Sequence, residues 1–204
     1  MKAYPSIPRT TRSDVPVYAF DKLDGSNLRA EASRKLGFHK FGKRNHLLDD
    51  TNPFLPEGEG LIRAKYEDVL MRILRDHRWE SATFFFEFWG PGSFAGNHEP
   101  EPHTVTLIDV SVYKKGFMEP RDFLRTFRDI DHAALLYHGN ANQPFLRSVE
   151  NSTLEGMTFE GVVCKGPWDR KTGMPLMFKA KSQAWIQKLK DRCGSNAALF
   201  EQLL

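Results

Sequence analysis

The sequence has few cysteines and no long apolar stretch. Its 204 residues include only Cys164 and Cys193, whose number and spacing fit neither a disulfide framework nor a zinc site. We therefore expect the protein to work in a reducing compartment. No window approaches the roughly 18 apolar residues of a membrane span, and residues 1–20 lack the apolar run of a signal peptide. These absences predict a soluble cytoplasmic protein with no membrane partner.

The sequence also lacks a strong charge of either sign. Lysine and arginine number 29 against 26 aspartates and glutamates, which gives a net charge of +3. This balance is compatible with a nucleic-acid partner and too mild to require one. Neither a Walker-type glycine loop nor a dinucleotide-binding G-x-G-x-x-G follows an expected strand, so nucleotide sites of those two types are excluded.

Apolar runs bounded by turn residues predict mostly strands. Apolar residues at helical spacing predict helices over residues 61–77 and 119–130, the second with Pro120 near its start. Residues 47–60 and 167–175 are rich in turn formers and are expected to be loops. The expected strands cover residues 15–20, 27–33, 36–42, 82–89, 104–113, 133–139, 158–166 and 176–181.

The order of these elements lacks a β-α-β rhythm and predicts an α+β fold with an antiparallel-sheet core. The length and a hydrophobic content of 40% suffice for a single domain over residues 1–204. Residues 182–204 have a helical pattern with a break or cap at Gly194. We expect this C-terminal tail to pack on the domain through Trp185, Ile186 and Leu189.

Seven charged residues stand in or beside apolar strands. Burying such a group without a partner costs about 2–7 kcal/mol, and more for an ion. Each one alone is explained by a strand residue that points to solvent. Together they favour convergence at one groove, where lysines and carboxylates suit a polyphosphate and its divalent metal. The set comprises Lys22, Glu87, Asp109, Glu160, Lys165, Lys179 and Lys181.

Five segments carry these residues in a fixed order: KLDGSN at Lys22, FFFEFWG at Glu87, TLIDVSV at Asp109, EGVVCK at Glu160 and FKAK at Lys181. They resemble motifs I, III, IIIa, IV and V of the covalent nucleotidyltransferases. This superfamily contains ATP-dependent DNA ligases, RNA ligases and mRNA capping guanylyltransferases. A lone K-x-D-G occurs in many turns, whereas the ordered set is specific. The resemblance implies a nucleotidyltransferase domain built on antiparallel sheets. Such a domain is ATP-grasp-like and corresponds to the adenylation domain of ligases.

The resemblance implies that Lys22 attacks the α-phosphate of ATP, expels pyrophosphate and carries AMP as a phosphoramidate. A lysine that is partly desolvated among other cations has a lowered pKa and can act as a nucleophile. The AMP then passes to a 5′-phosphate end, and a 3′-hydroxyl displaces it. Lys179 and Lys181 are implied as further catalytic residues, because alternate strand residues share one face and reach the same phosphates. Glu160 is implied as the ligand of a magnesium or manganese ion.

The same resemblance places three residues around the nucleoside. Glu87 would accept a hydrogen bond from a ribose hydroxyl. Ile108 stands where the family often has an aromatic residue that stacks on adenine, and an aliphatic face also contacts a base. Val162 or Val163 would contact the other side of the base.

The roles of four other residues are less specific. Asp24 would orient the Lys22 amine or accept its proton, and Gly25 would let the nucleotide approach the backbone. Arg44 resembles the motif Ia arginine, which meets a phosphate or the strand end, and its alternative is a solvated loop arginine. Asp109 is either a ligand or a structural residue that positions the neighbouring strand.

Asn27 separates the branches of the superfamily. DNA ligases usually carry arginine at the corresponding place, whereas many RNA ligases carry asparagine, so Asn27 favours an RNA ligase. The implied partner is a nucleic acid with 5′-phosphate and 3′-hydroxyl ends, such as a nicked RNA or RNA/DNA duplex. The alternatives are a minimal DNA ligase, a capping-type guanylyltransferase and a non-catalytic end-binding module.

The segment after motif V is short. Residues 182–204 are too few for the five-stranded oligonucleotide-binding barrel of DNA ligases and capping enzymes. We therefore expect no C-terminal barrel and a monomer. The chain is then either a minimal ligase, similar in size to phage-encoded repair enzymes, or a domain that relies on another chain to bind the strand.

Overall fold

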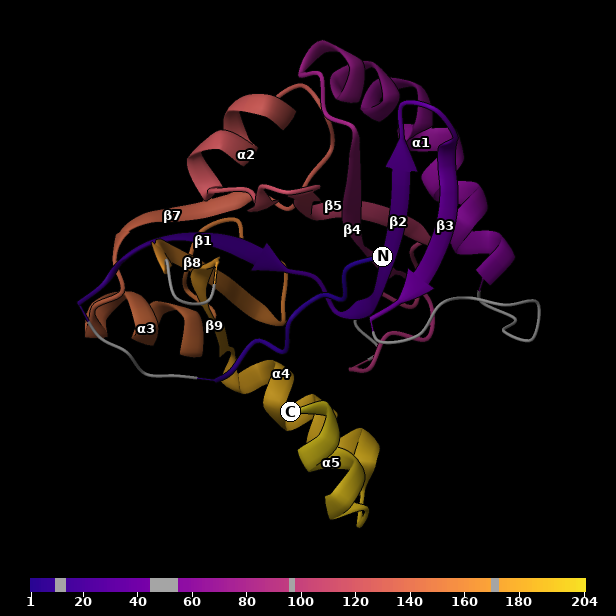
Figure 1. Cartoon of the computed structure of the whole chain (residues 1–204). Coiled ribbons are helices and arrows are strands. Elements are labelled where there is room, and N and C mark those ends of the chain that lie inside the picture. The colour runs from indigo at the N-terminus through magenta and orange to yellow at the C-terminus, as the bar shows by residue number, and fades with distance from the viewer. Residues whose placement is uncertain (10–13, 45–54, 96–97, 170–172) are drawn as a thin grey trace.

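Antiparallel strands form two sheets in the computed structural model (Figure 1). The strands of the first sheet are β1 (Pro16–Lys22), β7 (Leu135–Asn140), β8 (Gly161–Asp169) and β9 (Met174–Lys181). Those of the second sheet are β2 (Gly25–Ser33), β3 (Gly37–Lys43), β4 (Ser81–Trp89), β5 (Thr104–Val112) and β6 (Gly116–Phe117). The strand orders are β7-β1-β8-β9 and β3-β2-β4-β5-β6. The structure describes residues 1–9, 14–44, 55–95, 98–169 and 173–204.

Helices cover the outer faces of the sheets. The helices of the described residues are α1 (Leu55–Asp76), α2 (Pro120–Phe127), α3 (Gln143–Glu150), α4 (Gln183–Cys193) and α5 (Ala197–Leu203). Helix α1 lies along the second sheet, α3 lies against the first, and α4 and α5 extend from the end of β9 (Figure 1). Among these helices, none combines the length and the apolarity needed to cross a membrane.

Period-two alternation divides each strand between two environments. On β1, Val17 and Ala19 pack in the cluster with α3, whereas Phe20 joins the cluster of the second sheet with α1 and α2. On β4, Phe84 and Phe86 join that same cluster. The β1 face that carries Phe20 and the β4 face opposite Phe84 and Phe86 therefore border the space between the two sheets, where the charged residues collect.

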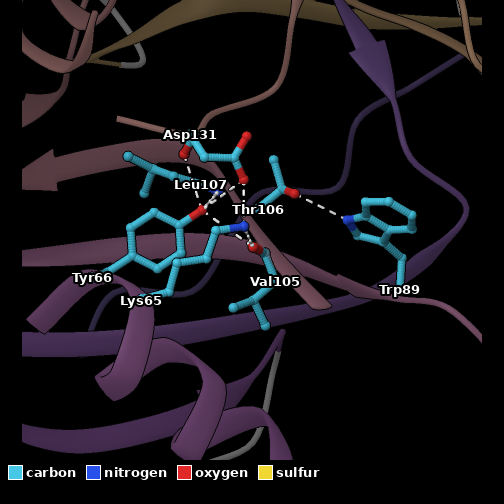
Figure 2. Close-up of polar contacts among 7 residues, drawn as sticks. All are labelled: Lys65, Tyr66, Trp89, Val105, Thr106, Leu107 and Asp131. Carbon is cyan, nitrogen blue, oxygen red and sulfur yellow. Dashed lines mark hydrogen bonds and ion pairs between the residues drawn. The ribbon is translucent and has the colours of Figure 1, made fainter. Parts of the chain in front are cut away.

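Polar contacts fix α1 to the second sheet (Figure 2). The buried Tyr66 hydroxyl accepts a hydrogen bond from the backbone N–H of Leu107 at 3.2 Å and lies 3.0 Å from the Asp131 carbonyl oxygen, to which it donates. Lys65 donates to the Val105 carbonyl at 2.9 Å and pairs with Asp131. These contacts hold one face of β5, so that its other face is fixed toward the first sheet.

The expected antiparallel core is confirmed, with every expected strand present. The helix expected over 61–77 begins earlier, at Leu55, so part of the expected loop over 47–60 is helix, and residues 47–54 lie outside the described residues. Gly58 disfavours a helix by its propensity, and a Cβ there would lie 2.5 Å from Leu28 Cδ1 on β2, so a larger residue would require the Leu28 side chain to move. Pro56 is tolerated in a first helical turn.

Other boundaries also differ from the sequence-based expectation. The strand expected over 158–166 begins at Gly161 and runs to Asp169, so the expected loop over 167–175 is largely strand; residues 170–172 lie outside the described residues. Helix α3 was not predicted, although Asn142 caps it by accepting a hydrogen bond from the Phe145 N–H at 3.0 Å. The helical tail and the break at Gly194, where φ is 55°, are confirmed.

Candidate active site

A cavity of about 380 Å³ lies between the two sheets. Both sheets, the N-terminal segment and the C-terminal tail contribute to its walls. Six of the seven charged strand residues singled out above line it, and Asp109 does not. The six are Lys22, Glu87, Glu160, Lys165, Lys179 and Lys181.

The register of the first sheet brings the catalytic candidates together. Lys22, the last residue of β1, pairs with Gly161 on β8, and Gly161 pairs in turn with Lys181 on β9. Glu160 directly precedes Gly161 and lies between the two lysines. Three segments that are far apart in the sequence thus meet at one end of the sheet.

Glu160 forms an ion pair with each lysine. Its Oε2 lies 2.8 Å from Lys22 Nζ, and its Oε1 lies 2.9 Å from Lys181 Nζ. The side chains of Glu160 and Lys181 are 3% and 2% exposed, whereas that of Lys22 is 22% exposed. Lys22 is therefore the member of this trio that solvent or a ligand reaches most easily.

The pKa values of the three lysines differ in direction. Burial lowers the pKa of Lys22, but the charges of Glu160 and Glu87 outweigh it, so the pKa of Lys22 is raised from 10.5. This corrects the expected lowering at the nucleophile. Burial lowers the pKa of Lys181 to about 8 and also lowers that of Lys179, because the charge of Glu160 offsets only part of the effect. Burial and neighbouring cations therefore lower the pKa values of Lys179 and Lys181, and not that of Lys22.

The second sheet supplies Glu87 and Asn27, which are cross-strand partners on β4 and β2 and both line the cavity. Burial and the charges of Glu160 and Asp24 raise the pKa of Glu87 to about 8, although Lys22 lowers it. The Asn27 amide donates to the Phe86 carbonyl at 3.3 Å, and its Oδ1 is buried without a hydrogen-bond partner among the described residues. These side chains place polar oxygens on the wall opposite Lys179.

Two glycines allow the strands to approach. A Cβ on Gly25 would lie 2.3 Å from the Phe88 carbonyl oxygen, so Gly25 is needed for contact between β2 and β4 and not only for access of a ligand. Gly161 has φ +141°, and its Cβ would lie 2.1 Å from the Ala180 carbonyl oxygen. Gly161 thereby permits the close pairing that surrounds Glu160 with two lysines.

Asp24 lies behind the cavity and makes no hydrogen bond to Lys22 among the described residues. It is fully buried, and its Oδ2 accepts a hydrogen bond from the Ala95 N–H at 2.8 Å. Its charge contributes to the raised pKa of Lys22, and its role in orienting or deprotonating the amine stays a prediction. Burial raises the pKa of Asp24, and the bond from Ala95 offsets part of that rise. Asp24 also fixes the loop that follows β4.

The apolar part of the cavity corrects one prediction. Val162 is fully buried on the face of β8 that packs against α3, whereas Val163 lines the cavity, because successive strand residues point to opposite faces. Ile108 lies on the cavity wall, as expected. Tyr4 and Ile7 also line it, although no sequence motif singled out the N-terminal segment.

Asp109 has a structural role. It is 1% exposed and pairs with Lys165 at 2.9 Å, while Tyr4 donates to it at 3.3 Å. Lys165 also donates to the Ile108 carbonyl at 2.8 Å. This buried pair joins the two sheets beneath the cavity floor, which favours the structural interpretation of Asp109 over the ligand interpretation.

Arg44 lines the cavity at its exposed rim. Its Nη2 donates to the Pro5 carbonyl at 2.8 Å. The backbone N–H of Lys179 donates to the Pro8 carbonyl at 3.0 Å. The N-terminal segment is thus held between Arg44 and β9.

The cavity wall also includes residues of the C-terminal tail. Trp185, Gln202 and Leu203 line it, as does Phe94 from the loop after β4. The sequence predicts Trp185 as a packing residue and gives no signal for the others. Gln202 and Leu203 reach the cavity only because α5 packs against α4 beyond the end of β9. Phe94 is 42% exposed, which is unusual for a large apolar side chain in this protein.

The carboxylates of the cavity could coordinate a divalent cation only together with oxygen atoms of a bound ligand. The described residues contain no cluster of three histidine, cysteine, aspartate or glutamate side chains that could hold a metal ion. Glu160 and Glu87 both present carboxylates to the cavity. Magnesium commonly binds through one or two carboxylates plus substrate phosphates. The residues therefore fit a cation that arrives with a polyphosphate, with Glu160 as the candidate ligand.

The fold is similar to solved structures of an RNA ligase from Naegleria gruberi. A variant structure with ATP and manganese is 16% identical with a TM-score of 0.68, covering 94% of this chain and 59% of that chain. The structure with pyrophosphate is 17% identical with a TM-score of 0.67 and the same coverage. Another variant with ATP and manganese is 18% identical with a TM-score of 0.63, covering 88% of this chain and 53% of that chain.

At these identities the likeness shows the fold alone: over the matched region this chain shares the fold of the Naegleria gruberi RNA ligase. This chain spans less than three-fifths of the length of the structures it matches. A comparison with protein-family models finds no match, and neither does one with curated proteins.

Proposed function

We propose that this chain is an ATP-dependent polynucleotide ligase that uses Lys22 as its nucleophile and acts on RNA ends. The observation that supports this proposal most directly is the pairing of Lys22 and Lys181 with one carboxylate, Glu160, in a cavity that also contains Lys179 and Glu87. The fold shared with an RNA ligase supports it independently. We propose further that residues 1–204 form one nucleotidyltransferase domain, with residues 182–204 packed on it.

The first step would transfer AMP to the protein. The neutral Lys22 amine attacks the α-phosphorus of ATP, the N–P bond forms, and the bond to the bridging oxygen breaks as pyrophosphate leaves. The amine must first lose a proton, which passes to solvent or to a phosphate oxygen. Because Glu160 raises the pKa of Lys22, the ion pair has to be weakened before the attack. Lys179 and Lys181 would bind phosphate oxygens as the charge on the leaving group grows.

A divalent cation, magnesium or manganese, would supply charge neutralisation on the phosphates when bound. Glu160 is the residue proposed to hold it, at the cost of contacts that this carboxylate now makes to two ammonium groups. Glu87 would accept a hydrogen bond from a ribose hydroxyl and can also donate one while protonated. Ile108 and Val163 would contact the base.

The preference for RNA is proposed from Asn27. Its buried Oδ1 has no hydrogen-bond partner in the described residues, and the residue lines the cavity beside Glu87. An unpaired buried acceptor favours a ligand that brings a donor, such as a hydroxyl. The proposed second substrate carries a 5′-phosphate and a 3′-hydroxyl, as at a nick in an RNA or RNA/DNA duplex.

The proposal is tested by incubating the protein with magnesium and ATP labelled at the α-phosphate. We expect label on the wild-type protein that survives denaturation and returns to ATP when pyrophosphate is added. Lys22→Ala should remain unlabelled, whereas Lys188→Gln, a lysine of α4 outside the cavity, should be labelled normally. ATP labelled at the γ-phosphate should leave no label. An unlabelled wild type, or a labelled Lys22→Ala, would contradict the proposal.

The substrate is tested with nicked duplexes that carry RNA or DNA on each side of the nick. Sealing is expected when RNA supplies the 3′-hydroxyl strand. Sealing of all-DNA nicks alone would support a minimal DNA ligase, and labelling by GTP in place of ATP would support a capping-type enzyme. Labelled protein without sealing of any nick would indicate that strand binding needs another chain.

A further inference from the structure

Lys181 is held from three directions. Its Nζ lies 2.9 Å from Glu160 Oε1, 3.3 Å from the Leu203 carbonyl oxygen and 3.6 Å from the centre of the Trp185 ring. An ammonium group has three N–H donors, and here a carboxylate, a carbonyl and an aromatic face are arranged around it. The orientation of Lys181 is therefore defined more tightly than that of Lys22, which has a single charged partner.

The Trp185 ring is itself rigidly placed. Ser182 caps α4 by accepting a hydrogen bond from the Trp185 N–H at 3.0 Å, and its hydroxyl donates to the Phe159 carbonyl at 2.7 Å. The Ser182 N–H donates to the Glu160 carbonyl at 2.9 Å. Ser182 is therefore bonded to the backbone of both residues and fixes the chain at Glu160 relative to the chain at Trp185. Trp185 is 1% exposed and packs against Ala95.

The edge of the indole faces motif I. The Trp185 Nε1 is buried and forms no hydrogen bond of ordinary geometry, yet it lies close enough to the Asp24 carboxyl to lower the pKa of that group. The Asp24 Oδ1 is also buried without a partner. A donor and an acceptor thus oppose each other behind the cavity, and their attraction restrains rotation of the ring.

We propose that Trp185 is a positioning residue for Lys181: the face of its ring holds the Lys181 ammonium group at the cavity wall, oriented toward the phosphates of the nucleotide. This inference rests on the proposed function for the identity of the ligand. Its physical basis is that a cation over an aromatic face is stabilised most where water is excluded. Simple core packing would require only an apolar side chain of similar size at this position.

Charged groups on several sides act on Lys181. Glu160 is its ion-pair partner at 2.9 Å, whereas Lys22 and Lys179 are nearby cations that repel it. The ring of Trp185 lies 3.6 Å from the same ammonium group, so removal of the ring should let the Lys181 side chain leave the cavity wall. A tryptophan that only fills space would not have this effect when another apolar side chain replaces it.

The test compares Trp185→Phe, which keeps an aromatic face, with Trp185→Met, which keeps apolar volume only. The rate of protein labelling by α-labelled ATP is measured at pH 8 by single-turnover kinetics. We expect Trp185→Met to label about five- to tenfold more slowly than the wild type and Trp185→Phe to retain most of the rate. Equal rates for Trp185→Met and the wild type would contradict the inference.

Two controls on the same helix separate positioning from stability. Leu189→Ala removes a fully buried side chain of α4 outside the cavity and should lower the melting temperature without slowing labelling at a temperature where the variant is folded. Lys188→Gln removes a second cation over a ring, the 5.4 Å contact with Phe159 outside the cavity, and should leave labelling unchanged. If Leu189→Ala slows labelling as much as Trp185→Met, the effect is structural and the inference is wrong.

A second readout does not need ATP. In the wild type, NMR should show the ε-methylene protons of Lys181, identified by their loss in Lys181→Arg, shifted upfield by the Trp185 ring current. The shift should persist in Trp185→Phe and disappear in Trp185→Met. Absence of the shift in folded wild type would overturn the inference. Absence of labelling in wild type with the ring-current shift intact would instead overturn the proposed function.

Discussion

At the residue scale, the cavity contains a carboxyl group, that of Glu87, whose pKa is raised well above its ordinary value. The pKa of Glu87 is about 8, chiefly because of burial, and the charges of Glu160 and Asp24 add to that rise against the opposing effect of Lys22. Near neutral pH this side chain therefore carries a proton in the folded protein. It can both donate and accept hydrogen bonds there, which widens the set of ribose contacts open to it.

This ionisation predicts a pH-dependent stability. A carboxyl whose pKa is raised from 4.5 to about 8 stabilises the fold fully below about pH 4.5, and that contribution is lost as the pH rises through 8. Glu87→Gln should therefore match the wild type in acid and exceed its free energy of unfolding by about 1–3 kcal/mol at pH 9, since one pH unit corresponds to about 1.4 kcal/mol.

Urea unfolding at pH 5, 7 and 9 measures this difference. The exposed Glu119→Gln is a suitable control and should change stability by less than about 0.5 kcal/mol at each pH. A Glu87→Gln variant that is no more stable than the wild type at pH 9 would contradict the assigned ionisation.

At the element scale, the hydroxyl of Tyr66 joins α1 to β5 (Figure 2). Tyr66→Phe would leave the buried N–H of Leu107 without its acceptor, and we expect a loss of about 1–3 kcal/mol in the free energy of unfolding. Lys65→Met removes the neighbouring, half-exposed ion pair with Asp131 and should cost less than about 1 kcal/mol. Thermal unfolding compares the two, and equal losses would show that the hydroxyl has no special role.

The β8–β9 pairing depends on Gly161. An alanine there would place its Cβ 2.1 Å from the Ala180 carbonyl oxygen at a φ of +141°, so we expect Gly161→Ala to separate the strands beside Glu160. Adenylate labelling should fall at least tenfold, together with the melting temperature. Gly60→Ala is the matched control, because it meets no atom within 4 Å in α1 and should stabilise the helix by about 0.5–1 kcal/mol. Normal labelling of Gly161→Ala would contradict the assigned geometry.

At the scale of the whole molecule, strand alternation explains both the success and the limits of prediction from sequence. The apolar strands with single charged residues already indicated a groove, and the structure brings Lys22, Glu160 and Lys181 into one cavity. The choice between Val162 and Val163 required the register, since neighbouring residues of one strand face opposite sides.

Long-range packing accounts for what the sequence could not reveal. Tyr4 and Trp185 reach the cavity from the two ends of the chain, and local patterns carry no information about such contacts. The pKa of Lys22 likewise depends on Glu160, which is distant in sequence and adjacent only through strand pairing. A motif identifies the residue types of a site, whereas its electrostatics follow from the fold.

The central claim is that Lys22 forms a covalent bond to AMP. The most direct measurement is mass spectrometry of the protein after incubation with ATP and magnesium, followed by peptide mapping. The claim predicts one adenylate group per chain, attached to the peptide that contains Lys22 and absent from Lys22→Ala. An adenylate on Lys179, Lys181 or any other residue of the wild type, or an unmodified protein, would contradict it.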